Sequence, residues 1–145
     1  MNTRKQQTGV MLLEALISIL IFSIGILAII GLQAAAVRAS SDAKYRSEAS
    51  LLTSQLVGQM SVSDRTSATL ITNFQGGAGC GVSGAAYVAW LADVTATLPG
   101  VVANPPTVCI VAGATAGSVA TITVFWLLPS DTGAAHQYRT IVPII

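Results

Sequence analysis

The sequence predicts an α+β protein in which one long N-terminal helix packs against a small antiparallel sheet. An apolar run from Val10 to Leu32 leads, without a proline, into a helix-favouring segment that reaches Met60. A second helical pattern occupies residues 85–98, and short β-branched segments separated by turns follow it. Because a helix stripe and a sheet face each need an apolar partner, we expect the two to cover one another.

Residues 1–9 are a short leader in which Arg4 and Lys5 are the only charged side chains. Positive charge before an apolar run keeps that end of the chain in the cytoplasm. The run that follows exceeds the roughly 7–15 apolar residues of an ordinary signal peptide, and it continues into Gln33 without a helix break. Taken alone, this layout predicts an uncleaved signal anchor with a translocated C-terminal domain, although residues 34–36 form a weak cleavage site.

The apolar run at 10–32 contains one charged residue, Glu14. As a helix the run would span about 34 Å, which is enough to cross the hydrocarbon core of a membrane. A charged side chain at the centre of a bilayer costs about 2.5–3.5 kcal/mol on insertion scales, and less near an end. Glu14 therefore either has a cationic partner or extends to the nearby interface, where a helix N-terminus favours negative charge.

Residues 33–60 are expected to continue the helix as an amphipathic half, because good helix formers are frequent there. Small and apolar residues recur on one face near helical spacing: Ala35, Ala39, Ala43, Ala49, Leu52, Leu56 and Met60. Asp42 and Arg46 stand four residues apart, as in an exposed ion pair. Gly25 and Gly31 either mark a place where the helix bends or are ordinary glycines of a membrane helix.

The C-terminal domain is predicted to comprise residues 61–145. Its first part, 61–84, is rich in turn-forming residues and is expected to be a loop. A glycine-rich stretch at 76–81 lacks the Lys-Ser/Thr of a phosphate-binding loop, which excludes a nucleotide site. It would let the backbone turn tightly around Cys80. Cys80 and Cys109 favour a disulfide in a translocated domain, with two buried reduced thiols as the alternative.

A short helix is predicted at 85–98, where a Pro-Gly pair follows it. Its apolar face comprises Tyr87, Trp90, Leu91, Val94 and Leu98. Strands are expected at 107–112, 118–128 and 137–142, joined as an antiparallel meander. The core-facing residues of the second strand alternate as Ala120, Ile122, Val124 and Trp126. Pro143 marks the third strand as an edge strand.

Composition excludes several classes of function. Charged residues make up only 9% of the chain and the formal net charge is +1, which does not fit a basic nucleic-acid-binding surface. The single histidine, His136, has no acid or nucleophile beside it and is expected to be a loop residue. No Ser-His-Asp set, pair of catalytic acids or metal-ligand cluster can be assembled. The sequence therefore predicts no enzymatic activity, metal, cofactor or nucleic-acid partner.

A basic leader ending in Gly9, followed by Val10-Met-Leu-Leu-Glu14 and a long apolar helix, resembles the signal of type IV prepilins. The long helix, small sheet and cysteine pair complete the layout of a pilin-like protein. Residues 13–17, 22–27 and 31–33 are most similar to the PilV-type minor pilins, the type IV pilus modification group. The specific motif covers residues 9–33, and the rest of the chain resembles the family in architecture.

The resemblance implies that a prepilin peptidase cuts between Gly9 and Val10 and then methylates the new amine of Val10. Glu14 becomes the fifth mature residue, the family's assembly glutamate, and would pair with the Val10 amine of the next subunit. Two positions depart from the family pattern. Val10 replaces the commoner Phe, and Gly31 stands where many major pilins carry a helix-breaking Pro.

The implied function is that of a minor pilin at or near a pilus tip, which primes polymerisation. The implied partners are the prepilin peptidase, other minor and major pilins, the inner-membrane assembly platform and, before assembly, membrane lipid. The chain would sit in the bacterial inner membrane with a periplasmic head, and then in the pilus. A type II secretion pseudopilin is the alternative; Gly25 and the Leu32-Gln33 pair favour the first reading. An adhesive or DNA-contacting tip is neither supported nor excluded.

Overall fold

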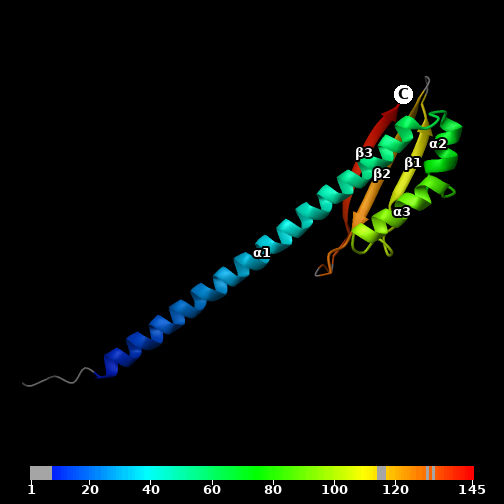
Figure 1. The fold of residues 1–145 in the computed structure, drawn as a ribbon. Helices are drawn as coiled ribbons and strands as arrows, with labels where there is room; N and C mark the ends of the chain where they lie inside the picture. Colours follow the sequence, from blue (N-terminus) through cyan, green and yellow to red (C-terminus); the bar gives the residue numbers. More distant parts are fainter. Residues whose placement is uncertain (1–7, 114–116, 130, 132) are drawn as a thin grey trace, which may run out of the picture. The chain divides into compact units, whose positions relative to one another are not determined.

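The computed structural model describes residues 8–113, 117–129, 131 and 133–145 (Figure 1). Along the chain lie the helices α1 (Thr8–Val62), α2 (Ser67–Phe74) and α3 (Ala85–Thr97) and the strands β1 (Thr107–Ala112), β2 (Ser118–Trp126) and β3 (His136–Ile144). The chain divides into two compact units between Ser41 and Asp42. We call residues 8–41 the stem and residues 42–145 the head unit. The predicted α+β class, with a long N-terminal helix and a small antiparallel sheet, is confirmed.

The long helix is confirmed almost to the residue, since α1 is continuous from Thr8 to Val62. It remains α-helical through Gly25 and Gly31, where an added Cβ would meet nothing within 4 Å. The predicted apolar stripe is only partly buried. Ala49, Leu52, Leu56 and Met60 lie in the core, whereas Ala35, Ala39 and Ala43 are exposed. The prediction was wrong for these three alanines because the core cluster of the head unit begins at Ala49.

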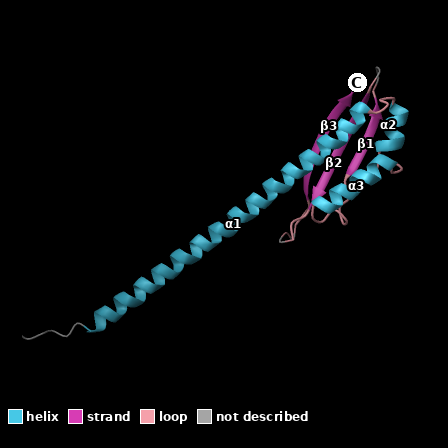
Figure 2. Ribbon diagram, in the orientation of Figure 1, coloured by secondary structure: helices cyan, strands magenta, loops and turns pink. Residues whose placement is uncertain are grey.

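The sheet is an antiparallel meander in the order β1-β2-β3, as predicted (Figure 2). Ala120 pairs with Ile110 on one side and with Val142 on the other. The predicted alternation is confirmed, because Ala120, Ile122, Val124 and Trp126 are all buried. Pro143 lies in the outer strand β3, where a missing N–H is tolerated. The Gly113 N–H donates to the Gly117 carbonyl at 2.8 Å, while residues 114–116 of the predicted turn lie outside the described residues.

One core fills the space between the helices and one face of the sheet. Every helix and strand of the head unit contributes buried apolar side chains to a single cluster. Figure 1 shows α2 and α3 beside β1, at the opposite edge of the sheet from β3. The residues that alternate with the buried ones along each strand lie on the other face of the sheet. Among them, Val111 and Ile141 are exposed. The architecture is therefore two layers, with helices on one side of a three-stranded sheet.

Helix α2 corrects the prediction of a loop over 61–84. Leu70 and Phe74 lie one turn apart and are both buried, so tertiary packing stabilises a segment whose threonines give little helix propensity. The N-cap Thr66 makes no side-chain capping bond. Instead the Asp64 carboxylate accepts hydrogen bonds from the Thr66 N–H at 3.0 Å and from the Thr69 hydroxyl at 3.1 Å. The start of α2 is thus fixed from outside the helix.

The Asp64 cap predicts an acid-sensitive contribution to stability. The pKa of Asp64 is lowered from its ordinary value of 3.8, chiefly by the hydrogen bond from the Thr66 N–H. A carboxyl group with a lowered folded-state pKa contributes stability above its unfolded value and loses it as the pH falls through the folded value. We therefore expect Asp64→Ala to lower the melting temperature by roughly 1–3 °C at neutral pH, and by progressively less below pH 3.8.

Thermal unfolding of the full chain in detergent, followed by circular dichroism from about pH 7 down to pH 2, measures this difference. The matched control is Asp93→Ala, which removes an exposed acid from α3. An Asp64→Ala deficit of the same size at every pH would contradict the capping role of the charged carboxylate.

Candidate assembly surface

The predicted cleavage site lies at the start of α1. Gly9 and Val10 both lie within the helix, which begins at Thr8, and the Val10 side chain is 70% exposed. The terminal turns of a helix open most easily, and a peptide bond in such a turn becomes accessible to an enzyme when the turn opens. The structure therefore places Gly9 and Val10 in the first turn of α1.

Glu14 lies one helical turn after Val10, about 6 Å further along the axis, and its side chain is exposed. In the described part of the chain the three ion pairs all lie in the head unit, and none includes Glu14. A lone carboxylate on an apolar helix needs a partner or water when that helix is buried in lipid or protein. The chain itself, over its described residues, does not supply that partner.

The stem around Glu14 is apolar on all sides. Large hydrophobic side chains from Val10 to Leu32 are all at least 41% exposed, as at Phe22 (69%) and Leu27 (68%). The helix is long and apolar enough to cross a membrane. A helix with no polar face is stable only when lipid or other apolar helices surround it. The apolar part of the stem therefore requires an apolar environment, either lipid or other helices.

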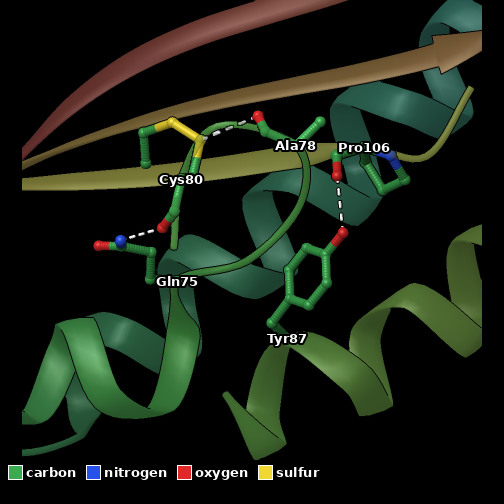
Figure 3. Close-up of a disulfide and its surroundings, with 6 residues drawn as sticks. Gln75, Ala78, Cys80, Tyr87 and Pro106 are labelled. Atoms are coloured by element: carbon green, nitrogen blue, oxygen red, sulfur yellow. Dashed lines mark hydrogen bonds between the residues drawn. A yellow bond between two sulfur atoms is a disulfide. The ribbon is translucent and has the colours of Figure 1, made fainter. Parts of the chain in front are cut away.

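The head unit is closed by a disulfide between Cys80 and Cys109, so the alternative of two reduced thiols is wrong for this structure (Figure 3). The bridge joins the glycine-rich loop to β1. Gly77, Gly79 and Gly81 all have positive φ, which confirms the expected tight turn around Cys80. The Gln75 side-chain amide donates to the Cys80 carbonyl oxygen within this loop.

Two buried aromatic residues of α3 donate hydrogen bonds to backbone carbonyl groups of other segments. The Tyr87 hydroxyl donates to the Pro106 carbonyl oxygen at 2.7 Å (Figure 3), and burial raises the pKa of Tyr87. The Trp90 Nε1–H donates to the Leu52 carbonyl oxygen of α1 at 2.9 Å. Gly76 packs so closely on the Tyr87 ring that an added Cβ would lie 2.3 Å from it. The predicted aromatic face is therefore core, as expected, with each buried donor satisfied.

His136 corrects a second prediction, because it is not an isolated loop residue. It opens β3, and its Nε2 lies 2.8 Å from Asp131 Oδ2 while its Nδ1 lies 3.2 Å from Asp42 Oδ1. The expected Asp42–Arg46 pair is absent among the ion pairs of the described residues, since Asp42 faces His136 and the Trp126 indole instead. Sequence carried no signal for this cluster, because Asp42 and His136 are 94 positions apart.

Comparisons with models of known protein families, with curated proteins and with solved structures gave no match to this chain. The features of this chain that bear on function are therefore the stem, its single carboxylate and the Gly9–Val10 junction. The predicted site residues fall into two groups in the fold. Gly9, Val10 and Glu14 share the first turns of α1, while Cys80 and Cys109 staple the head unit.

Proposed function

We propose that this chain is a minor pilin that contributes to type IV pilus biogenesis through its N-terminal helix. Support comes from one observation above all. A membrane-length apolar helix carries a single unpartnered carboxylate, Glu14, one turn after the Gly9–Val10 junction, among the described residues. This is the arrangement that the prepilin resemblance implies.

In this proposal a prepilin peptidase cuts between Gly9 and Val10 and methylates the Val10 amine. Before assembly the stem is a single-pass anchor in the bacterial inner membrane, with the N-terminus cytoplasmic and the head unit periplasmic. The assembly platform then transfers the stem from lipid into a bundle formed with other minor and major pilins. Both environments satisfy a helix that is apolar on every side.

Cleavage before Val10 also gives Glu14 a role. Cleavage creates a cationic amine at Val10, and N-methylation keeps it basic. When stems stack, the Glu14 carboxylate of one subunit pairs with the Val10 amine of the next. A desolvated charge left without its partner is strongly unfavourable, so the pair selects one stagger between neighbouring helices.

Mass spectrometry of the mature N-terminus tests the proposal. We expect the chain isolated from membranes to begin at Val10 and to carry one additional methyl group on its amine. An intact leader from Met1 in the mature protein would refute membership in the prepilin class. Because a type II secretion pseudopilin would have the same N-terminus, sheared surface fibres are analysed in parallel. Recovery of the methylated chain in those fibres supports the pilin, and its absence there together with co-purification of secretion components supports the pseudopilin.

A further inference from the structure

A groove of about 600 Å³ lies between α1 and β3 in the head unit. Tyr138 of β3 lines one side, and its hydroxyl accepts a hydrogen bond from the Ser50 hydroxyl of α1 at 3.4 Å. The other side is one face of α1, whose residues follow the spacing i, i+3, i+4, i+7, i+8 and i+11: Ala43, Arg46, Ser47, Ser50, Leu51 and Ser54. Because four of these six side chains are Ala or Ser, another helix can approach α1 closely here.

The exposed face of α3 has the same spacing of residues. All six of its members are exposed: Ala85, Val88, Ala89, Ala92, Asp93 and Ala96. Each of the two faces extends over eleven residues, which corresponds to about 17 Å along a helix axis. Each also carries one charged residue, one larger aliphatic residue and four small ones. The two faces therefore match in length and in the kind of side chain they present.

The order of the side chains selects one relative direction of the two helices. In the antiparallel register that aligns the ends of both faces, Arg46 faces Asp93. Leu51 faces Val88, and each remaining small residue faces another small residue. In the parallel register Arg46 would face Val88, and Leu51 would face Asp93. Because a charge placed against an aliphatic group loses water without gaining a partner, the antiparallel register is the favourable one.

The charges of the two faces are available to pair with each other. In the part of the chain that the structure describes, the three ion pairs include neither Arg46 nor Asp93. The α3 helix of the same chain packs on α1 through its buried face, where the Trp90 Nε1–H donates to the Leu52 carbonyl oxygen. Its exposed face is directed away from its own α1. The matching face must therefore come from another molecule.

We propose that the groove between α1 and β3 receives the exposed face of α3 from a second copy of this chain. The groove lies beside β3, and α3 lies beside β1 at the opposite edge of the sheet (Figure 1). Each copy thus offers α3 to one neighbour and its groove to another, which is a heterologous contact that can continue beyond a pair. The contact goes beyond the proposed function, because it requires neither leader removal nor the pairing of Glu14.

Two single-cysteine forms of the full chain test this contact in phosphatidylcholine vesicles. The two native cysteines are joined to each other, so the added cysteine is the free thiol of each form. One form carries Ser50→Cys and the other Ala89→Cys, at positions that face each other in the antiparallel register. We expect mild oxidation of the mixture to give a disulfide-linked pair of one chain of each form, because a disulfide needs its Cβ atoms within about 4.5 Å.

The matched control mixes Ser54→Cys with Ala96→Cys, which lie on the same two faces but meet only in the parallel register. Its cross-linked yield should be lower by roughly fivefold or more, because antiparallel helices place these positions at opposite ends of the contact. Equal yields from the two mixtures would overturn the proposal. None of the four substituted residues belongs to the core, so these changes leave the packing of the head unit intact.

An exchange of charges tests the pair of Arg46 and Asp93. Arg46→Asp in the form with Ser50→Cys places two acids opposite each other and should lower the yield by roughly threefold. Asp93→Arg in the form with Ala89→Cys should then restore the yield, because opposite charges face each other again. A lost yield that this exchange does not restore would also overturn the proposal. Neither measurement depends on leader removal or fibres, so the contact can fail while the pilin proposal stands, and the reverse.

Discussion

Glu14→Ala is expected to leave membrane insertion and leader removal unchanged and to lower incorporation into fibres by roughly 100-fold or more. Insertion is preserved because the substitution makes the stem still more apolar, and cleavage is preserved because Gly9 and Val10 are intact. Incorporation is lost because the Val10 amine of the neighbouring subunit would be buried without its carboxylate. Removing one member of a buried ion pair costs about 3–5 kcal/mol, which corresponds to a factor of roughly 10²–10⁴.

The measurement is the ratio of the chain in sheared fibres to the chain in the membrane fraction, with the mature N-terminus checked in both. Glu14→Gln keeps the shape of the side chain and removes its charge, so it should fail in the same way. Ser23→Ala is the matched control in the same apolar helix, since the Ser23 hydroxyl only donates to the Ile19 carbonyl at 2.7 Å. Processed Glu14→Ala that is incorporated at the normal level would exclude the assembly role of this residue.

The residues of the proposed assembly site could be selected from the sequence because they are neighbours in the chain. Gly9, Val10 and Glu14 fall within two turns of one helix, and the apolar run around them is itself the signal for a membrane or a bundle. What the fold adds is the exposure of the large apolar side chains from Val10 to Leu32 and the lack of a partner for Glu14 among the described residues. In the proposal that partner belongs to another subunit, so no single chain would contain it.

The sheet could be predicted for a similar reason. Strand alternation depends on local periodicity, and short connections leave an antiparallel meander as the simplest topology. The order and the buried face of β2 follow from that pattern. Strand β3 is longer than expected, since it begins at His136, which has contacts to Asp131 and Asp42. His136, the first residue of β3, contacts side chains outside the strand, and the alternation of the strand gives no information about such contacts.

Helix α2 and the contacts of His136 could not be predicted from the sequence. Six of the eight residues of α2 have only middling helix propensity, and the helix depends on the burial of Leu70 and Phe74 in the core beside α3 and β1. The cluster depends on α1 and β3 lying side by side, which is decided by the packing of the whole core. In both cases a tertiary contact selects a local conformation that propensity leaves open.

The double variant Cys80→Ala/Cys109→Ala is expected to lose about 3–4 kcal/mol of unfolding free energy and roughly 10–20 °C in melting temperature. The two cysteines are 29 positions apart, and the loop that they close contains the whole of α3. Without the bridge, the unfolded chain regains the freedom of that loop, which the chain-entropy model equates with this loss.

Denaturant unfolding of the full chain in detergent measures the loss, with and without a reducing agent. Reduction of the unmodified protein should reproduce the deficit, and it should have no effect on the double variant, which has no thiols. A stability that ignores both reduction and substitution would show that the bridge contributes little. Gly77, Gly79 and Gly81 each adopt a positive φ beside Cys80, and glycine loses more conformational freedom on folding than any other residue. A covalent link to β1 offsets that loss in a loop, residues 76–83, where Cys80 is the only buried side chain.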